Sequence, residues 1–539
     1  MKIVVADKIA ERGLQLLREP GWSVATPAAP DLLGTLTDAD ALIVRSATRV
    51  NAETLDAATR LRVVGRAGVG VDNIDVDAAT LRGVLVMNTP GGNSISVAEH
   101  AMALLLALAR SVPHLNTAMH DGRWEKSGAA GTELRGKTLA LIGLGRVGFE
   151  VARRARAFEM HVIAHDPYIA PEIAREAGVE LLPLPEALAR ADFLSLHAAL
   201  SPATERIVNA ATLAQLKRGA RIVNTARGEL IDEVALADAL RSGHVAGAAL
   251  DVFTIEPPRN SPLLAMPNVI ATPHVAGSTQ EAQEEVGVQI AQQVRDYLQT
   301  GVIRNAVNLP TLSAEQYRRV RPYLELAERL GALVAQVAPA PAARVRITYT
   351  GAPAEMGATL LRNAVLAGLL NTVLEEKVNL VNAAKIAAAR GLAIEEHTRR
   401  REHGFPDRLE VAISEPDGRP LAAEGTVLHG TAPRLLSLDG VDLEATLEGT
   451  MLFTRSRDVP GVIGRIGTAL GALGVNIATF ALGRRESSLG GEALALVRVD
   501  GDAPEPALAA LRAIEAITEV RRVRMPAAPR AQQSAMTFP

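Results

Sequence analysis

The chain has 539 residues, of which 48% are hydrophobic, 22% charged and 3% aromatic, and its formal net charge is −3. This ordinary globular usage excludes global disorder, and the lack of a basic excess argues against a nucleic-acid binder. Because there is no cysteine, disulfides, thiolate catalysis and cysteine-ligated zinc are excluded. The N-terminus lacks the apolar region of a signal peptide, and no apolar run approaches the roughly 20 residues of a membrane span. We therefore expect a cytoplasmic protein of about three to four domains, with no metal site and no nucleic-acid or membrane partner.

Up to about residue 310, short β-branched runs alternate with helical stretches, which predicts βαβ units and parallel sheets. The runs are too many for one small sheet, so we expect an α/β region with two Rossmann-like, doubly wound lobes. A long apolar helix at 95–110 is expected to bridge them, and Pro310 with the polar TLSAEQYRR that follows suggests a linker. The predicted strands lie at 2–6, 41–46, 61–68, 84–89, 138–143, 161–166, 192–197, 221–226, 247–253 and 268–272.

The second half of the chain has a different pattern. Residues 315–445 predict an α+β module with helices and alternating strands, and residues 447–525 predict the order βαββαβ of a ferredoxin-like unit. A polar tail at 527–539 is expected to be disordered. In the α+β module the expected helices are 320–336, 354–371 and 378–390, and the expected strands include 345–351 and 408–414.

Glycines at Gly143, Gly145 and Gly148 follow one predicted strand and open an apolar helix. Such glycines permit a tight turn and close approach to a pyrophosphate, which the N–H groups of the helix N-terminus then bind. Asp166 ends the next strand, where a carboxylate would bond a ribose 2′-hydroxyl and repel a 2′-phosphate. The motif therefore predicts NAD rather than NADP, the alternative being a glycine-rich turn without ligand. A second glycine series, predicted only to let its helix pack closely, comprises Gly461, Gly464, Gly467, Gly471 and Gly474.

Three polar residues each follow one of three consecutive predicted strands: Arg227, Glu256 and His274. Because ligands bind outside the carboxyl ends of parallel strands, all three are expected beside the Gly143 turn. A guanidinium holds a carboxylate in a forked contact, and a histidine can take a hydroxyl proton. A carboxylate beside that histidine orients the ring and raises its pKa. Each residue alone is compatible with a surface cation, a helix cap or a loop histidine; their joint placement favours hydride chemistry on a hydroxy acid.

The motifs LIGLGRVG, NTARGELID, ALDVFTIEPP and TPHVAGST resemble those of the D-isomer-specific 2-hydroxyacid dehydrogenases. The resemblance implies that Arg227 binds substrate, Glu256 orients the base, His274 is the acid/base and Asp251 is associated with the nicotinamide carboxamide. It also implies a substrate domain split into 1–96 and 284–310 around an NAD-binding domain at 97–283. The further residues expected to contact NAD are Arg146, Val147, Thr225, Ala226 and Gly277.

The first lobe resembles the substrate-side segments of one branch of that family, the phosphoglycerate dehydrogenases. The carrying segments are LIVRSAT, RAGVGVDNID and NTPGGNSISVAEH. Val69 and Gly70 would offer backbone N–H groups to a substrate carboxylate. Arg45 is the candidate phosphate partner, the alternative being a strand-end arginine in an ion pair. Lys126 is a weaker candidate, because its WEK segment departs from the WxR form of the family.

The C-terminal half resembles the intervening domain of the long form of that branch (311–446) and an ACT domain (447–526). In ACT domains Asp458 and Asn476 would face an amino-acid effector, although Asp458 could instead cap its helix. The combination implies NAD-dependent oxidation of 3-phosphoglycerate to 3-phosphohydroxypyruvate in L-serine biosynthesis, inhibition by L-serine, and a homotetramer. The alternatives are a hydroxypyruvate or glyoxylate dehydrogenase, and an NAD-sensing binding protein of the corepressor type.

Overall fold

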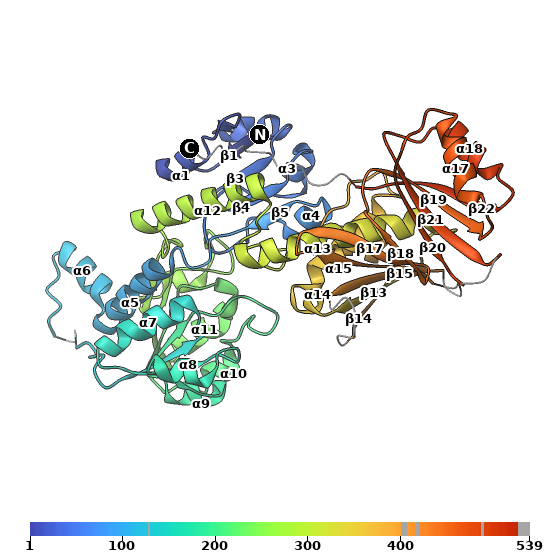
Figure 1. Ribbon diagram of the computed structural model, residues 1–539. Coiled ribbons are helices and arrows are strands. Elements are labelled where there is room, and N and C mark those ends of the chain that lie inside the picture. Colours follow the sequence, from blue (N-terminus) through green and yellow to red (C-terminus); the bar gives the residue numbers. More distant parts are fainter. Residues whose placement is uncertain (128–129, 400–406, 416–417, 419, 487–489, 527–539) are drawn as a thin grey trace, which may run out of the picture.

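The computed structural model describes residues 1–526 except 128–129, 400–406, 416–417, 419 and 487–489, so the predicted tail at 527–539 lies outside the described residues. Two parallel-sheet lobes are followed by two further sheet domains that extend away from them (Figure 1). No single helix of the described part is long and apolar enough to cross a membrane; α5 (Ser94–Arg110) and α6 (Val112–His120) pass that test only as a pair bent by 65°.

The first lobe is a five-stranded parallel sheet in the order β2-β1-β3-β4-β5. Its central strands are apolar on both faces because helices cover both. The strand β2 was missed by the sequence prediction because it is a three-residue edge strand. The strands are β1 (Lys2–Val5), β2 (Ser23–Ala25), β3 (Ala41–Val44), β4 (Val63–Arg66) and β5 (Leu85–Met87), and the helices are α1 (Glu11–Leu16), α2 (Leu32–Leu36), α3 (Ala52–Ala57), α4 (Val76–Leu81) and α12 (Gln280–Thr300).

The second lobe is a seven-stranded parallel sheet in the order β12-β11-β10-β9-β6-β7-β8, which confirms the predicted doubly wound topology. The expected boundaries at 97 and 284 fall inside α5 and α12, whose first residues lie just after the two places where the chain passes between the lobes. Its strands are β6 (Thr138–Ile142), β7 (His161–His165), β8 (Glu180–Leu181), β9 (Phe193–Leu196), β10 (Ala220–Asn224), β11 (Val245–Leu250) and β12 (Val269–Ala271). Its helices are α5 (Ser94–Arg110), α6 (Val112–His120), α7 (Arg146–Ala157), α8 (Pro171–Glu176), α9 (Leu184–Arg190), α10 (Ala210–Leu213) and α11 (Glu233–Arg241).

The third domain is a six-stranded mixed sheet, β14-β13-β15-β16-β17-β18, with α13 packed against it and α15 packed against α13. The expected linker after Pro310 is wrong, because α13 begins at Ala314, where Ser313 and Gln316 form a reciprocal capping box. Its elements are α13 (Ala314–Val337), β13 (Arg344–Thr350), α14 (Ala352–Glu355), α15 (Ala358–Leu370), α16 (Ala383–Ala389), β14 (Ala393–Arg399), β15 (Arg408–Ser414), β16 (Leu421–Leu428), β17 (Ala432–Leu438) and β18 (Val441–Ala445).

Two helices expected in this domain are shorter than predicted. The expected helix 354–371 is interrupted at Gly357, whose φ of 116° lies outside helical geometry. The expected helix 378–390 starts only at Ala383, because the Asn379 and Asn382 side chains bond the backbone of 377–382 in a turn. The same two amides donate to Gly83 and Leu81 of the first lobe, at 2.9 and 3.4 Å, and so tie the third domain to it.

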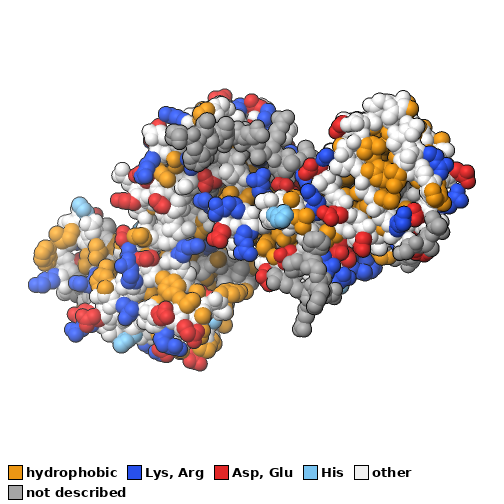
Figure 2. All heavy atoms as spheres, in the orientation of Figure 1, with side chains coloured by type: hydrophobic (Ala, Val, Ile, Leu, Met, Phe, Trp, Pro, Cys, Tyr) orange, Lys and Arg blue, Asp and Glu red, His pale blue; other side chains and the backbone are white. Residues whose placement is uncertain are grey.

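The C-terminal domain has the predicted βαββαβ order and an antiparallel sheet, β20-β21-β19-β22. One sheet face packs on α17 and α18; the other joins the core of the third domain. Apolar side chains also gather on the visible surface at this end, while charges of both signs are interspersed elsewhere (Figure 2). The elements are β19 (Thr450–Arg457), α17 (Val462–Gly471), β20 (Ile477–Arg484), β21 (Glu492–Val499), α18 (Glu505–Arg512) and β22 (Ile517–Arg524).

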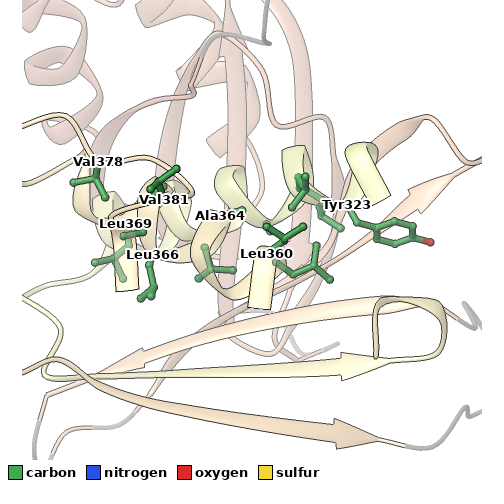
Figure 3. Packing of buried hydrophobic residues seen from close by; sticks show 14 of the residues in the cluster. Tyr323, Leu360, Ala364, Leu366, Leu369, Val378 and Val381 are labelled. Atoms are coloured by element: carbon green, nitrogen blue, oxygen red, sulfur yellow. The ribbon is translucent and has the colours of Figure 1, made fainter. Parts of the chain in front are cut away.

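A single hydrophobic cluster runs from the first lobe through α12 and α13 into the third domain and onto the C-terminal sheet. Figure 3 shows its centre, where Leu360, Ala364 and Leu366 of α15 lie among the buried side chains. The helices α13 and α15 cross so closely that a Cβ at Gly331 would lie 2.1 Å from the Val365 carbonyl oxygen. A Cβ at Gly368 would lie 1.9 Å from the carbonyl oxygen of Glu328.

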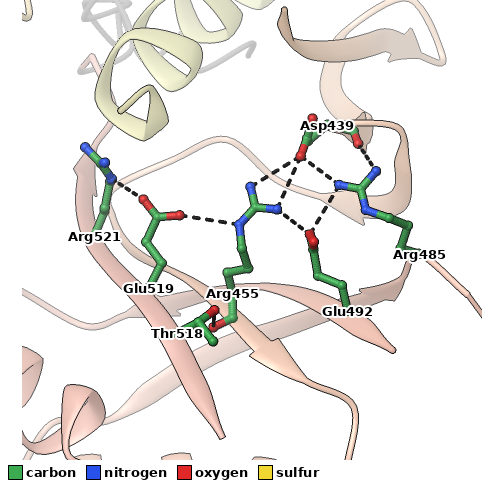
Figure 4. Close-up of polar contacts among 7 residues, drawn as sticks. All are labelled: Asp439, Arg455, Arg485, Glu492, Thr518, Glu519 and Arg521. Carbon is green, nitrogen blue, oxygen red and sulfur yellow. Dashed lines mark hydrogen bonds and ion pairs between the residues drawn. The ribbon is translucent and has the colours of Figure 1, made fainter. Parts of the chain in front are cut away.

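Ion pairs complete the joint between the third and C-terminal domains (Figure 4). Asp439, in the turn after β17, accepts from Arg485 at 2.7 Å and from Arg455 at 3.3 Å. Arg455 also pairs with Glu492 and, at 3.4 Å, with Glu519. The C-terminal domain is therefore fixed to the third domain by both apolar and charged contacts.

The close packing expected of the α17 glycines is wrong within one chain. A Cβ at Gly461, Gly464, Gly467, Gly471 or Gly474 would meet no described atom within 4 Å. These positions face outward, whereas the close crossing of α13 and α15 depends on Gly331 and Gly368, whose isolated spacing gave no sequence signal.

We expect Gly368→Ala to destabilise the protein by about 1–3 kcal/mol, because the added methyl collides with backbone that cannot rotate away. The matched control is Gly467→Ala, where the space is open and the higher helix propensity of alanine should leave stability unchanged or raise it by up to about 1 kcal/mol. Denaturant unfolding of both variants measures the difference, and equal stability of the two would contradict this packing.

Candidate functional site

The glycine turn between β6 and α7 has the geometry that a dinucleotide needs. Gly143 has a φ of 93°, and a Cβ there would lie 2.7 Å from the backbone nitrogen of Ala198. A Cβ at Gly148 would lie 2.4 Å from the carbonyl oxygen of Gly143, whereas one at Gly145 would meet nothing within 4 Å of the described atoms. Because no side chain of the described residues caps α7, its first N–H groups face this open space. The turn therefore fits a pyrophosphate.

Asp166 stands directly after β7, as predicted, and its carboxylate accepts backbone N–H bonds from Leu144 at 2.8 Å and Tyr168 at 2.9 Å. One carboxylate oxygen is thus attached to the glycine turn itself. Its contact with a ribose hydroxyl stays a prediction.

The two lobes enclose a cavity of about 700 Å3 that collects most of the predicted site. Arg146 is the first residue of α7, beside the cavity, and its side chain lies close to Gly91, which precedes α5. Lys126 is exposed and is not among the lining residues. The predicted residues that line the cavity are Arg45, Val69, Gly70, Val147, Thr225, Ala226, Arg227, Glu256, His274 and Gly277.

His274 and Glu256 form the central pair. The Nδ1 of His274 lies 2.7 Å from Oε2 of Glu256, and Oε1 of Glu256 accepts the Phe253 N–H at 3.1 Å. An ionised carboxylate can only accept, so Nδ1 carries the proton and Nε2 keeps a free lone pair for the cavity. His274 has a φ of 52°, a left-handed conformation that turns its ring toward Glu256.

Arg227 lies on the same side of the cavity. Its Nη1 donates to the carbonyl oxygen of Ala226 at 2.7 Å, and its Nη2 lies 3.0 Å from the carboxylate of Asp72 in the first lobe. A Cβ on Gly70 would lie 2.1 Å from this guanidinium, so the glycine leaves room for it. Asp72 therefore occupies the face of Arg227 on which a substrate carboxylate is expected.

Two further arginines face the cavity from the first lobe. Arg45 donates from Nη1 to the Lys8 carbonyl oxygen at 3.3 Å. Arg66, the first residue of the segment RAGVGVDNID, was not among the predicted site residues, yet it lines the cavity, and its Nε has no hydrogen-bond partner in the described part of the chain. Burial, with the like charges of Arg227 and Arg45, lowers the pKa of Arg66. Its place at the carboxyl end of β4 was the available signal, because the rule that located Arg227 applies equally to the first lobe.

Asp251 is fully buried and does not line the cavity. Its carboxylate accepts from the N–H groups of Val275 and Ala276, each at 2.9 Å, and from the Thr272 hydroxyl. Burial alone would raise the pKa of Asp251, but bonds from His100, Thr272 and these N–H groups outweigh it and lower the pKa to about 2. The carboxylate holds the loop that carries His274; its expected contact with the nicotinamide stays a prediction.

Besides Nε of Arg66, two buried polar atoms at the cavity lack partners among the described residues: Nδ1 of His197 and Oγ1 of Thr225. Nε2 of His197 lies 2.9 Å from the Ser195 hydroxyl, so the ring is anchored at one end only. Burial lowers the pKa of His197 to about 4, which keeps the ring neutral near pH 7. Unsatisfied polar groups beside an open glycine turn fit the hydroxyl-rich dinucleotide predicted there.

The two effector candidates lie at opposite ends of the C-terminal sheet. Asp458 follows β19 and pairs with Arg484 at 3.0 Å in a small cavity. It does not cap α17, whose N-cap is Gly461. Asn476 precedes β20, at the other end of the sheet, and donates to Asp500 at 2.6 Å. One chain therefore does not bring these two side chains to one ligand.

Proton abstraction beside a dinucleotide turn, with cations to hold an acid, is the chemistry of NAD-dependent 2-hydroxyacid dehydrogenases, and the fold and site define that class. Residues 102–276 match the sequence profile of the D-isomer specific 2-hydroxyacid dehydrogenase NAD binding domain. Residues 319–439 match the D-3-phosphoglycerate dehydrogenase intervening domain, and residues 450–516 match the ACT domain.

Full-length relatives sharpen this result. A D-3-phosphoglycerate dehydrogenase of Methanocaldococcus jannaschii is 42% identical over 95% of this chain and 97% of its own length. One from Bacillus subtilis is 39% identical over 93% and 95%. The chain belongs to the D-3-phosphoglycerate dehydrogenase family. Among solved structures, the two lobes resemble a glyoxylate reductase of Paecilomyes thermophila with 32% identity and a TM-score of 0.52, covering 57% of this chain and 98% of that one.

The depressed pKa of His197 gives a pH dependence. Between about pH 6.5 and pH 4 the unfolded chain binds a proton at this residue and the folded chain does not, so stability falls as the pH is lowered through that window. We expect His197→Gln to lose less stability there than wild type, whereas exposed His161→Gln should behave like wild type. Urea unfolding at stepped pH measures this; parallel curves for all three proteins would contradict it.

Proposed function

We propose that this chain is an NAD-dependent D-3-phosphoglycerate dehydrogenase that oxidises 3-phospho-D-glycerate to 3-phosphohydroxypyruvate. The observation that carries the proposal is one cavity in which the Glu256–His274 pair faces three guanidinium groups, those of Arg227, Arg45 and Arg66. A substrate with both a carboxylate and a phosphate needs that excess of cations. The names of the relatives favour this substrate over hydroxypyruvate or glyoxylate, and over a binding protein without turnover.

His274 removes the proton in this reaction. Its free Nε2 takes the C2 hydroxyl proton, and the positive charge that forms on the ring is stabilised by Glu256 at 2.7 Å. NAD+, when bound, supplies the hydride acceptor for C2. Because Glu256 fixes the Nδ1–H tautomer, Nε2 is the base before turnover and the acid in the reverse direction.

The arginines divide the substrate between the lobes. Arg227 offers the carboxylate a forked contact once Asp72 gives way, and the N–H groups of Val69 and Gly70 face the same region. Arg45 and Arg66 of the first lobe remain for the phosphate, whose charge balances the repulsion among the guanidinium groups. Closure of the lobes over the substrate would exclude water.

Regulation belongs to the same proposal. The ACT match supports an amino-acid effector, for which L-serine is proposed, with the ammonium on Asp458 in place of Arg484. Since Asp458 and Asn476 lie at opposite ends of one sheet, a site using both needs a second copy, which supports the proposed homotetramer. A cytoplasmic location is proposed with it.

The first test follows NADH oxidation with 3-phosphohydroxypyruvate and with hydroxypyruvate. Preference for the phosphorylated acid by about 100-fold or more is expected from two charge-assisted phosphate contacts. Arg45→Gln, and Arg66→Lys as the conservative variant, should each reduce that preference about tenfold or more while hydroxypyruvate turnover changes little. Equal kcat/KM for both acids in wild type would indicate a general 2-hydroxyacid dehydrogenase, and no turnover would favour a binding protein.

The second test adds L-serine to the same assay. Asp458→Asn should raise the serine concentration for half-inhibition about tenfold or more, because the ammonium loses its counter-charge. Arg484→Gln should lower it, since the competing guanidinium is gone. The same concentration in both variants would contradict a site at Asp458, and no inhibition of wild type would remove serine as the effector.

A further inference from the structure

The loop 272–279 is the segment by which the chain leaves the second lobe for the first. It follows β12 and ends at Thr279, the N-cap of α12. The first lobe packs on α12, whereas the second lobe packs on α5. His274 therefore lies on the crossing between two bodies, where movement of the lobes would disturb it unless the loop is held to one of them.

Two residues, Asp251 and His100, hold this loop to the second lobe. The buried carboxylate of Asp251 accepts from Val275 and Ala276, and the Asp251 carbonyl oxygen accepts the His274 N–H at 2.8 Å. His100, on α5, places Nε2 at 3.1 Å from the Thr272 hydroxyl and 3.5 Å from the Asp251 carboxylate. The start and the middle of the loop thus share one hydrogen-bonded network with the second lobe.

The far end of the loop has a different attachment. The Thr279 hydroxyl accepts the Ala282 N–H at 3.1 Å and so caps α12. It also lies 2.7 Å from the hydroxyl of Ser96, a buried residue on α5. Ser96 and His100 are four residues apart on α5 and lie on one helix face, which is the face against the loop.

We propose that Ser96 and His100 are positioning residues for the reaction, and that the lobes rotate about the Ser96–Thr279 contact while His274 stays fixed to the second lobe. Neither residue lines the cavity. His100 acts through Thr272 and Asp251 on the His274 loop, and Ser96 ties the end of that loop to α5. The proposal rests on the proposed function, because it takes His274 as the base.

The arrangement has a chemical reason. His274 has to keep its distance to C2 in the same frame that holds the cofactor, and that frame is the second lobe. A displacement of the base by about 1 Å can cost about 100-fold in rate. Attaching the loop to α5 rather than α12 separates the position of His274 from the movement that admits the substrate.

The test is a double-mutant cycle between His100 and His274 in the full chain. His100→Leu should lower kcat about tenfold with an unchanged Kd for NADH by fluorescence titration, and His100→Gln, which keeps a donor for Thr272, should restore most of the loss. In a His274→Gln background, His100→Leu should lower the residual rate less than twofold. Ser96→Ala should lower kcat at least threefold, with recovery in Ser96→Thr, and Ala103→Ser, exposed on α5, serves as the control.

The outcomes separate the two proposals. If wild type shows no turnover, the proposed function itself fails. If wild type turns over and His100→Leu keeps full kcat, or lowers the rate equally with and without His274, His100 does not act through the base and the inference is wrong. Thermal unfolding of every variant identifies any that is misfolded. If His100→Leu or Ser96→Ala is misfolded, the activities of His100→Gln and Ser96→Thr test the inference instead. Full activity of Ser96→Ala would contradict the proposal that the lobes rotate about the Ser96–Thr279 contact.

Discussion

One continuous hydrophobic core governs how this molecule can move. It joins the first lobe, α12, α13, the third domain and one face of the C-terminal sheet, so these parts behave as a single body. The second lobe has two clusters of its own and is connected through α5 and the loop 272–279. Sliding within the large body would expose apolar surface at a cost of roughly 25 cal/mol per Å2, which opposes such movement.

The site divides along the same line. Arg45 and Arg66 belong to the large body, and Arg227, Glu256 and His274 belong to the second lobe. In this conformation a cross-lobe contact at the cavity is the Arg227–Asp72 ion pair. Substrate that takes the place of Asp72 would exchange one anion for another on Arg227 and bring the phosphate to the opposite wall. In the proposed binding mode, the charge of the substrate would therefore bridge the two bodies.

Much of the site was predictable because parallel strands bring their carboxyl ends to one edge. That rule predicts from the sequence alone that Arg227, Glu256 and His274 lie together. The rule applies equally to Arg66, but the sequence does not show whether the side chain of an arginine at a strand end is buried, because that depends on the packing around it. Pairings across the molecule, such as His100 with Thr272, were not predictable because they depend on how two loops fold back against α5.

Other failures have local causes. A polar segment after proline suggested a linker, although Ser313 and Gln316 carry the signature of a capping box. The α17 glycines repeat like a packing motif, yet they face outward, whereas Gly331 and Gly368 permit the real crossing. The shared core also escaped prediction, because a strand that is apolar on both faces has the same sequence pattern whether its second face meets a helix or another domain.

The joint of Asp439 with Arg455 and Arg485 adds a charged part to that core. A kosmotropic salt such as sulfate screens charge pairs and strengthens apolar contacts, so it acts in opposite directions on the charged and apolar parts of the joint. At high concentration such a salt would thus leave the two domains attached by their apolar contacts while it weakens the ion pairs that fix their orientation.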